Sequence, residues 1–347
     1  MKHKLIGIDL AKNVFQVCAV NQAGKLVFNH AVGRARLPKV MAEMEPTTVA
    51  MEACASGHYW GRRFEQLGHQ VLLVPPQHVQ PFVRGGKSDA RDALAIVEAA
   101  QRPKLHPVPI KSLLQQDLQS IHRARRLCIA QLTAIGNQIR GISREYGVEF
   151  NSGIHALVKQ LPEVLEDGEN DLTPVVRQLI SEQLQQLGNA RRRNEELHAR
   201  MVELASQDPA YVRLLALPGV GPVVASAYLA SIGNGHQFHK GREVSAWLGL
   251  VPKQHGTGGK ISLGGMSKNG DRYLRTLLIH GARAAICWSR NKQTPLASWV
   301  NPMVARRGMN KTVVALANKI ARISWLVVAR GEQYDVNKAF GSEHPAS

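Results

Sequence analysis

Four acidic side chains in the first hundred residues have the spacing of a divalent-metal site. Asp9 lies near the end of the first predicted strand and Glu52 ends the fourth, while Asp89 and Asp92 open the helix after the fifth. A separation of three residues puts Asp89 and Asp92 on one helix face, roughly 5–6 Å apart at Cβ. Clustered carboxylates need cations to neutralise them, and hard ions such as Mg²⁺ take oxygen ligands. We therefore predict a catalytic site in which these four acids hold Mg²⁺, or Mn²⁺, for phosphodiester chemistry.

Three of these acids, taken alone, also have an ordinary structural explanation. Asp89 suits a helix N-cap, Asp92 offsets the helix dipole in the first turn, and Asp9 is a turn former. Glu52 closes the apolar run 49–51 and has no capping role there. The joint pattern of the four acids favours the catalytic interpretation.

The segments that carry these acids alternate between predicted strands and helices. Apolar or alternating runs predict strands at 4–10, 13–20 and 25–32, a helix at 37–44, a strand at 48–52, a helix at 57–67, a strand at 70–74 and a helix from Ser88. A meander of antiparallel strands that passes into crossover units predicts an α/β domain of the RNase H-like (RuvC-like) fold over 1–110. In this order the first and fourth strands are neighbours, so Asp9 and Glu52 converge.

Two long helices are predicted over 111–207. Apolar positions from Leu114 to Ile142 keep an alternating spacing of four and three, interrupted only by Arg125, and a second such run extends from Val176 to Leu204. This is the spacing of an α-helical coiled-coil linker, which could pair within one chain or between chains. Shorter helices punctuated by glycine then predict a mainly α C-terminal domain over 208–332, and the tail 333–347 is expected to be disordered.

The C-terminal domain contains two glycine-rich segments with possible roles at DNA. Gly219 and Gly221 precede an Ala-rich helix, as in helix-hairpin-helix turns that bind a DNA backbone. The segment 252–275 combines six glycines with cations and hydroxyls, and a flexible loop of this kind can approach phosphates closely. Thr257, Ser262 and Ser267 are its candidate nucleophiles, and the spacing does not choose among them.

The charge balance indicates a polyanionic partner. The 347 residues include 44 Lys and Arg against 26 Asp and Glu, a formal charge of +18, which favours nucleic acid. No run approaches the roughly 18 apolar residues of a membrane span, and the four cysteines lie far apart, so we expect a cytoplasmic protein without zinc or disulfides. The predicted nucleic-acid contacts are Arg84, Lys87, Gly219, Gly221, Lys253, Lys260, Lys268, Arg272 and Arg275.

Six motifs spread over nearly the whole chain resemble one known family. They are GIDLAK, AMEACASGHYW, KSDARDA, LPGVGPVVA, WLGLVPKQHGTGGK and MSKNGDRYLR. Together they resemble the DEDD transposases of bacterial insertion sequences, the IS-one-ten and IS-eleven-eleven group. The resemblance implies a RuvC-like domain, a coiled-coil linker and a C-terminal transposase domain, with Asp9, Glu52, Asp89 and Asp92 as the metal-binding tetrad.

The resemblance also implies a mechanism and partners. The family's C-terminal domain supplies a serine nucleophile from a glycine-rich segment, and the aligned hydroxyl here is Thr257, a departure from serine. Family membership further implies donor and target DNA, a noncoding guide RNA encoded by the element, and a homo-oligomer that is a dimer or tetramer.

Three other functions are weighed against transposition. A RuvC-like nuclease that cuts branched DNA or RNA without rejoining it would use the same acids, but it leaves the segment 252–275 without a chemical role. An actin-like nucleotide-binding protein also begins with GID, yet Ala11-Lys12-Asn13 follows where a glycine-rich phosphate loop is expected. A noncatalytic DNA-binding protein would need only the charge and the glycine turn.

Overall fold

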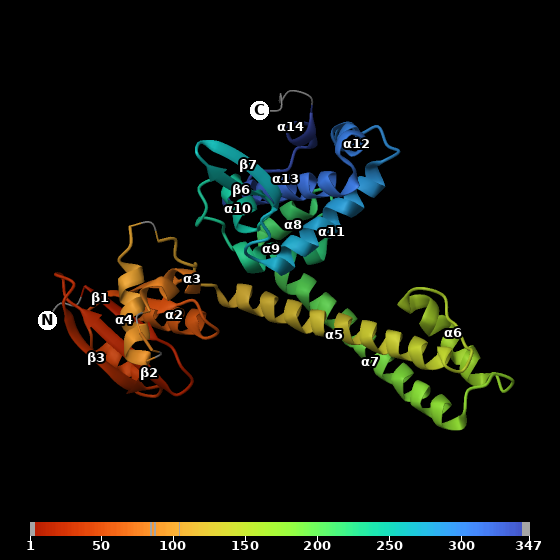
Figure 1. The fold of residues 1–347 in the computed structure, drawn as a ribbon, viewed down its shortest axis with the longest axis horizontal. Helices are drawn as coiled ribbons and strands as arrows, with labels where there is room; N and C mark the ends of the chain where they lie inside the picture. Colours follow the sequence, from red (N-terminus) through yellow and green to blue (C-terminus); the bar gives the residue numbers. More distant parts are fainter. Residues whose placement is uncertain (1–3, 84, 87, 104, 342–347) are drawn as a thin grey trace. The chain divides into compact units, whose positions relative to one another are not determined.

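The computed structural model of the chain describes residues 4–83, 85–86, 88–103 and 105–341. The chain forms two compact units, Met1–Ser112 and Leu113–Ser347, drawn from red to orange and from yellow to blue in Figure 1. The first is a mixed α/β unit built on a sheet, and the second is mostly helical. Both agree with the fold class predicted from the sequence.

The first unit is organised around a five-stranded sheet with the strand order β3-β2-β1-β4-β5. Its elements are β1 (Leu5–Asp9), β2 (Val14–Val20), β3 (Leu26–Gly33), α1 (Leu37–Ala42), β4 (Thr48–Glu52), α2 (Gly57–Gln66), β5 (Gln70–Val74), α3 (Pro76–Val79), η1 (Gln80–Phe82) and α4 (Asp89–Ala100). β1, β2 and β3 pair antiparallel, whereas β1–β4 and β4–β5 are parallel. The predicted order of strands and helices is confirmed, including the contact between β1 and β4.

Alternation along β1 gives the sheet two different faces. Ile6 and Ile8 are fully buried in the core under α1 and α2. Gly7 and Asp9 point the other way, toward α4, which lies across the sheet (Figure 1). A Cβ atom at Gly7 would come within 2.5 Å of Cγ2 of Val97 on α4, so only glycine allows this helix to pack so closely. The close packing brings the first turn of α4 to the end of β1.

Two long helices dominate the start of the second unit. α5 (Leu113–Arg144) and α7 (Pro174–Ala205) run side by side, and the shorter α6 (Ile154–Glu166) connects them (Figure 1). Ile139 of α5 packs with Ile180 near the start of α7, and Leu118 packs with Met201 near its end, so the pair is antiparallel. The apolar positions of the predicted seam in α5 are buried or half-buried. Assembly of these helices as a coiled coil between protomers stays a prediction.

The remaining helices enclose the largest core of the chain. They are α8 (Pro209–Leu215), α9 (Pro222–Ile232), α10 (Gly241–Trp247), α11 (Arg272–Ser289), α12 (Pro295–Arg307), α13 (Met309–Ala329) and α14 (Val336–Phe340). Among the described residues only α13 is long and apolar enough to cross a membrane. Its side chains Leu316, Ile320 and Trp325 are buried in the core of this unit, which accounts for its apolar sequence.

Two segments of the second unit differ from the sequence-based predictions. Residues 252–266 form a hairpin of β6 (Pro252–Thr257) and β7 (Lys260–Met266) rather than a loop. The predicted disorder of the tail is wrong for 333–341, where Asp335 caps α14 and Phe340 packs on Trp299 with ring centroids 5.6 Å apart. Residues 342–347 lie outside the described part of the chain.

A buried histidine links three helices of the second unit. Nδ1 of His122 on α5 lies 3.0 Å from the hydroxyl of Tyr273 on α11, and Nε2 lies 3.1 Å from Oγ of Ser226 on α9. Ser226 donates to the carbonyl oxygen of Pro222 at 2.7 Å, so its oxygen accepts from Nε2–H and Nδ1 accepts from Tyr273. Burial, with the positive charge of Arg125, lowers the pKa of His122 to about 4. The ring is therefore held neutral.

We expect His122 to make stability fall with acidification. Its folded pKa of about 4 is below the ordinary value of 6.5, so between these pH values the unfolded chain binds a proton that the folded chain excludes. The contribution of His122 to the free energy of unfolding is therefore at its maximum above pH 6.5. It decreases as the pH falls toward 4, by on the order of 3 kcal/mol. In urea titrations at several pH values, His122→Gln should lose this contribution but keep the similar one from His58, whose pKa burial also lowers to about 4. His239→Gln, at an exposed position, should keep both. Equal slopes for all three proteins would contradict the assignment.

Candidate active site

The ends of β1 and β4 bring two of the predicted acids to one face of the sheet. Ile8 pairs with Met51 in the parallel ladder, so Asp9 and Glu52 are the next residues along each strand. Alternation puts both side chains on the face covered by α4, because Ala50, two residues before Glu52, packs with Ala93 of that helix. The predicted convergence of Asp9 and Glu52 follows from this register.

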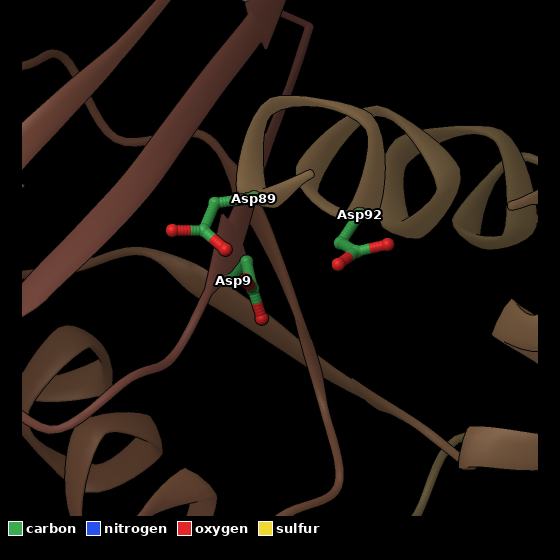
Figure 2. A group of neighbouring side chains, drawn as sticks. All are labelled: Asp9, Asp89 and Asp92. Atoms are coloured by element: carbon green, nitrogen blue, oxygen red, sulfur yellow. The ribbon is translucent and has the colours of Figure 1, made fainter. Parts of the chain in front are cut away.

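The first turn of α4 adds the other two acids. Asp89 is the first residue of the helix and Asp92 follows one turn later. Ligand oxygens of Asp9, Asp89 and Asp92 all lie within 4.8 Å of one another, and Figure 2 shows the three side chains gathered between the end of β1 and the start of α4. Backbone N–H groups at the start of a helix favour negative charge, which partly offsets the repulsion among the three.

Glu52 lies beside this group but outside the set of three. The pKa of Glu52 is raised, first because the carboxyl is half-buried and second because of the negative charge of Asp92. The strand register, which makes Glu52 the neighbour of Asp9, places the fourth acid beside the same space. The site therefore contains a compact trio and one neighbouring carboxyl.

The donor set fits a hard divalent cation. Three carboxylates with oxygens within 4.8 Å repel one another, and Asp9 and Asp92 are only partly exposed to the screening of water. Mg²⁺ and Mn²⁺ prefer oxygen ligands and use few carboxylates, leaving positions for water and phosphate oxygens. Such an arrangement can bind a phosphodiester and polarise it.

Side chains on the sheet also hold the start of α4 in place. Gln16, which faces Asp9 across the β1–β2 ladder, donates from Nε2 to Oδ1 of Asn29 at 2.6 Å. Asn29 in turn donates from Nδ2 to the carbonyl oxygen of Ala90 at 2.9 Å. Because Ala90 lies between Asp89 and Asp92 in the first turn, Asn29 fixes the position of that turn against the sheet. Gln16 and Asn29 were not predicted from the sequence, although polar residues at inward strand positions were an available signal.

Replacing Asn29 by alanine should weaken the acid site without unfolding the unit. Residues that orient metal ligands typically contribute 10- to 100-fold to metal affinity or activity, so we expect Mn²⁺ affinity, measured by calorimetry, to fall by about that factor. Thr48→Ala is the control, because this variant loses a side-chain hydrogen bond within the same sheet, to Gln70, at the opposite end of β4. Unchanged Mn²⁺ affinity in Asn29→Ala would show that the hydrogen bond to Ala90 does not position the acids.

The predicted nucleophile lies at the tip of the β6–β7 hairpin in the second unit. Thr257 is exposed and ends β6, where Gly258 (φ 56°) and Gly259 (φ 79°) form the turn. His255 pairs with Ser262 and Thr257 pairs with Lys260, so these four polar side chains share one face of the hairpin. The imidazole of His255 is therefore a neighbour of these hydroxyls, a role that was not predicted from the sequence. A Gly-Gly pair between two alternating runs was the signal for the hairpin.

The other predicted contacts fall into three classes. Lys253, Lys260, Lys268 and Arg272 are exposed on the hairpin or just after it. The exposed Gly221 is the N-cap residue of α9. A Cβ at Gly219 would lie 2.3 Å from the carbonyl oxygen of Gly281, so close packing on α11 explains that glycine. Arg84 and Lys87 lie outside the described residues.

The structure does not support Arg275 as a nucleic-acid contact. Its side chain is buried, and Nη1 donates to the carbonyl oxygens of Leu248 at 2.9 Å and Asn269 at 2.6 Å. The guanidinium therefore holds the loop between the hairpin and α11. Ser267 is also less available as a nucleophile, because its Oγ is buried without a hydrogen-bond partner among the described residues.

Comparison with known proteins gives matches across both units. Residues 6–147 match the family model DEDD_Tnp_IS110, described as a transposase, and residues 211–296 match the family described as Transposase IS116/IS110/IS902. A probable family 20 transposase of Pseudomonas aeruginosa is 44% identical over 95% of this chain and 98% of its own. The transposases for the insertion sequence elements IS1111A of Coxiella burnetii and IS1328 of Yersinia enterocolitica are each 38% identical, over 95% and 94% of this chain and 91% and 97% of their own.

Proposed function

The chain belongs to the IS110 family of DNA transposases, and we propose that its N-terminal unit is a RuvC-like domain whose acids hold Mg²⁺ or Mn²⁺ at the reaction site. Transposases cleave and rejoin DNA, so the site must act on phosphodiesters. Asp9, Asp89 and Asp92 are the proposed ligands, and Glu52 is the fourth acid. The observation that carries this proposal is the convergence of the three aspartate carboxylates within 4.8 Å.

The chain's own residues prepare this site for a phosphodiester. Asp9 is fixed by the β1 ladder, and Asn29 fixes the first turn of α4, so the carboxylates are positioned before substrate arrives. The bound cation would supply charge stabilisation to the phosphate oxygens of the scissile strand. The carboxylates alone would repel that phosphate, and this repulsion explains why a cation is needed.

We propose Thr257 as the nucleophile that joins the protein covalently to DNA. Its exposed position beside a flexible glycine turn supports this role, because a bulky phosphodiester can reach the hydroxyl. Cations on the same hairpin and just after it, Lys253, Lys260, Lys268 and Arg272, are the proposed phosphate contacts, with the backbone at Gly221. Arg84, Lys87 and Gly219 are further proposed contacts with nucleic acid, on the basis of the sequence. The buried Arg275 is not among them.

Further partners in the proposal come from family membership. The family implies a noncoding guide RNA encoded by the element, which would choose donor and target sites. It also implies a dimer or tetramer, in which α5 and α7 would form a coiled coil between protomers. Exposed apolar side chains on these helices, Leu127 and Ile129 on α5 and Val175 and Leu179 on α7, support a partner along this pair.

A recombination assay in cells tests the proposed function. Donor and target plasmids carrying the element's native flanking DNA are combined with wild-type protein or with Asp9→Asn, and the junctions are counted by sequencing. We expect junctions only with the wild type. Metal-dependent cleavage of branched DNA without any junctions would instead favour a structure-selective nuclease.

A further inference from the structure

A cavity in the second unit lies outside every site described above. Its volume is about 650 Å³, and its walls are the start of α10, the second half of α13 and residues 330–339. This volume falls within the range of small-ligand sites, about 300–1,000 Å³. The cavity is therefore large enough for a ligand of the size of one or two nucleotide units.

Cations outnumber acids on the walls of this cavity, which are otherwise largely apolar. The described lining includes two acids, Glu332 and Asp335. Both are already engaged: Glu332 pairs with Lys338 at 3.3 Å, and Asp335 accepts from the first N–H groups of α14. The lysines and arginines of the lining are Lys240, Arg242, Lys319, Arg322, Arg330 and Lys338.

Most of these cations have no carboxylate partner within the described parts of the chain. The ion pairs there include Lys338 but none of Lys240, Arg242, Arg322 or Arg330. Concentrated charge of one sign is unfavourable unless an ion of the opposite sign neutralises it. The cavity therefore favours binding of an anion from solution.

Lys319 is a cation of the same cavity that is partly shielded from water. The side chain is half-buried, and its Nζ lies 5.2 Å from the ring centroids of both Trp299 and Phe340. Burial, with the nearby positive charge of Arg322, lowers the pKa of Lys319. Aromatic rings compensate a desolvated cation only partly, whereas a phosphate oxygen would accept a stronger, charge-assisted hydrogen bond.

We propose that this cavity binds the phosphate groups of a single-stranded nucleic acid. The inference rests on the proposed function only in taking nucleic acid as the ligand class. A concave site of this volume admits one flexible strand, while a duplex would touch only its rim. Tyr334, half-buried on the wall, offers a ring on which a base can stack.

Binding of short oligonucleotides to the full chain tests this proposal. Fluorescently labelled single-stranded and duplex 10-mers, in DNA and RNA versions, would be titrated at several salt concentrations against the Asp9→Asn protein, so that no strand is cut. Lys240→Gln/Arg322→Gln removes two exposed cavity cations, and Arg306→Gln/Arg307→Gln removes two exposed cations from the end of α12 as the matched control. Comparison of the affinities for single-stranded DNA and single-stranded RNA would identify which of the two the cavity prefers.

We expect the cavity variant to bind the single strand about tenfold or more weakly than the control. The slope of log affinity against log salt should also fall in magnitude by about 1.4, since each phosphate contact to a single strand contributes about 0.7. Unchanged affinity and slope, or an equal loss for the duplex, would overturn the proposal. Equally tight binding of a free nucleoside monophosphate would overturn the assignment to a strand.

A single variant and the recombination assay cover the remaining outcomes. If the double variant unfolds, Lys240→Gln alone should still lower the slope by about 0.7. Retention of recombination by Asp9→Asn would overturn the proposed acid site, but it would leave the oligonucleotide result intact. The two proposals therefore fail by different measurements.

Discussion

Replacing Asp9 by asparagine is expected to reduce recombination by about 10³-fold or more while leaving most of the DNA affinity in place. Asp9 is the strand residue of the trio whose oxygens lie within 4.8 Å, and asparagine keeps its shape while removing its charge. Charge stabilisation of a phosphoryl oxygen by a bound cation is worth several kcal/mol, and each 1.36 kcal/mol is a factor of ten in rate. Plasmid recombination and filter binding on the same preparations would measure the two quantities.

Removing the charge of any of the other three acids should also abolish recombination. Asp89→Asn and Asp92→Asn remove members of the trio, so both should lower Mn²⁺ affinity as Asp9→Asn does. Glu52→Gln should also abolish recombination, although Glu52 lies outside the trio. Glu65→Gln, on the exposed side of α2, is the control and should behave as wild type. Wild-type turnover in Asp9→Asn would contradict the assignment of the acids.

Much of the acid site could be predicted because short-range patterns determine it. Alternation in β1 and β4 indicated strands, and the order of elements made those strands neighbours, so the meeting of Asp9 and Glu52 followed. Two aspartates three residues apart must share a helix face. The hydrogen bond from Asn29 to Ala90 spans 61 residues, and no local pattern reveals the packing that makes it possible.

Errors in the C-terminal half have two physical origins. Charge in a sequence does not reveal burial, so Arg275 looked like a phosphate contact although its guanidinium serves two backbone carbonyls. The tail looked disordered because α14 is too short to be stable alone, and it forms because Phe340 packs on Trp299. The high glycine content hid the β6–β7 hairpin. Contacts distant in sequence determine the structure around Arg275 and in the tail, whereas the hairpin is a local pairing that the Gly-Gly turn could have indicated.

Removal of the Thr257 hydroxyl is expected to stop covalent capture of DNA. In the proposed step Oγ1 of Thr257 attacks phosphorus, a new P–O bond to the protein forms, and one P–O bond of the DNA strand breaks. The hydroxyl proton passes to a base, and the departing DNA oxygen gains a proton. Thr257→Ala should therefore give no protein–DNA adduct on denaturing gels, whereas Thr257→Ser should keep or raise the yield, because serine is less hindered.

The three candidate hydroxyls differ in their positions on the hairpin. Ser262 lies on the same face, opposite His255, while Oγ of Ser267 is buried. Ser262→Ala and Ser267→Ala should therefore retain the adduct if Thr257 is the nucleophile, and His255→Gln should slow its formation if that imidazole takes the proton. An adduct that is formed by Thr257→Ala but lost in Ser262→Ala would identify Ser262, on the neighbouring strand, as the nucleophile. Because the two hydroxyls share one face, such a result would change the nucleophile but keep the hairpin as the site of strand attachment.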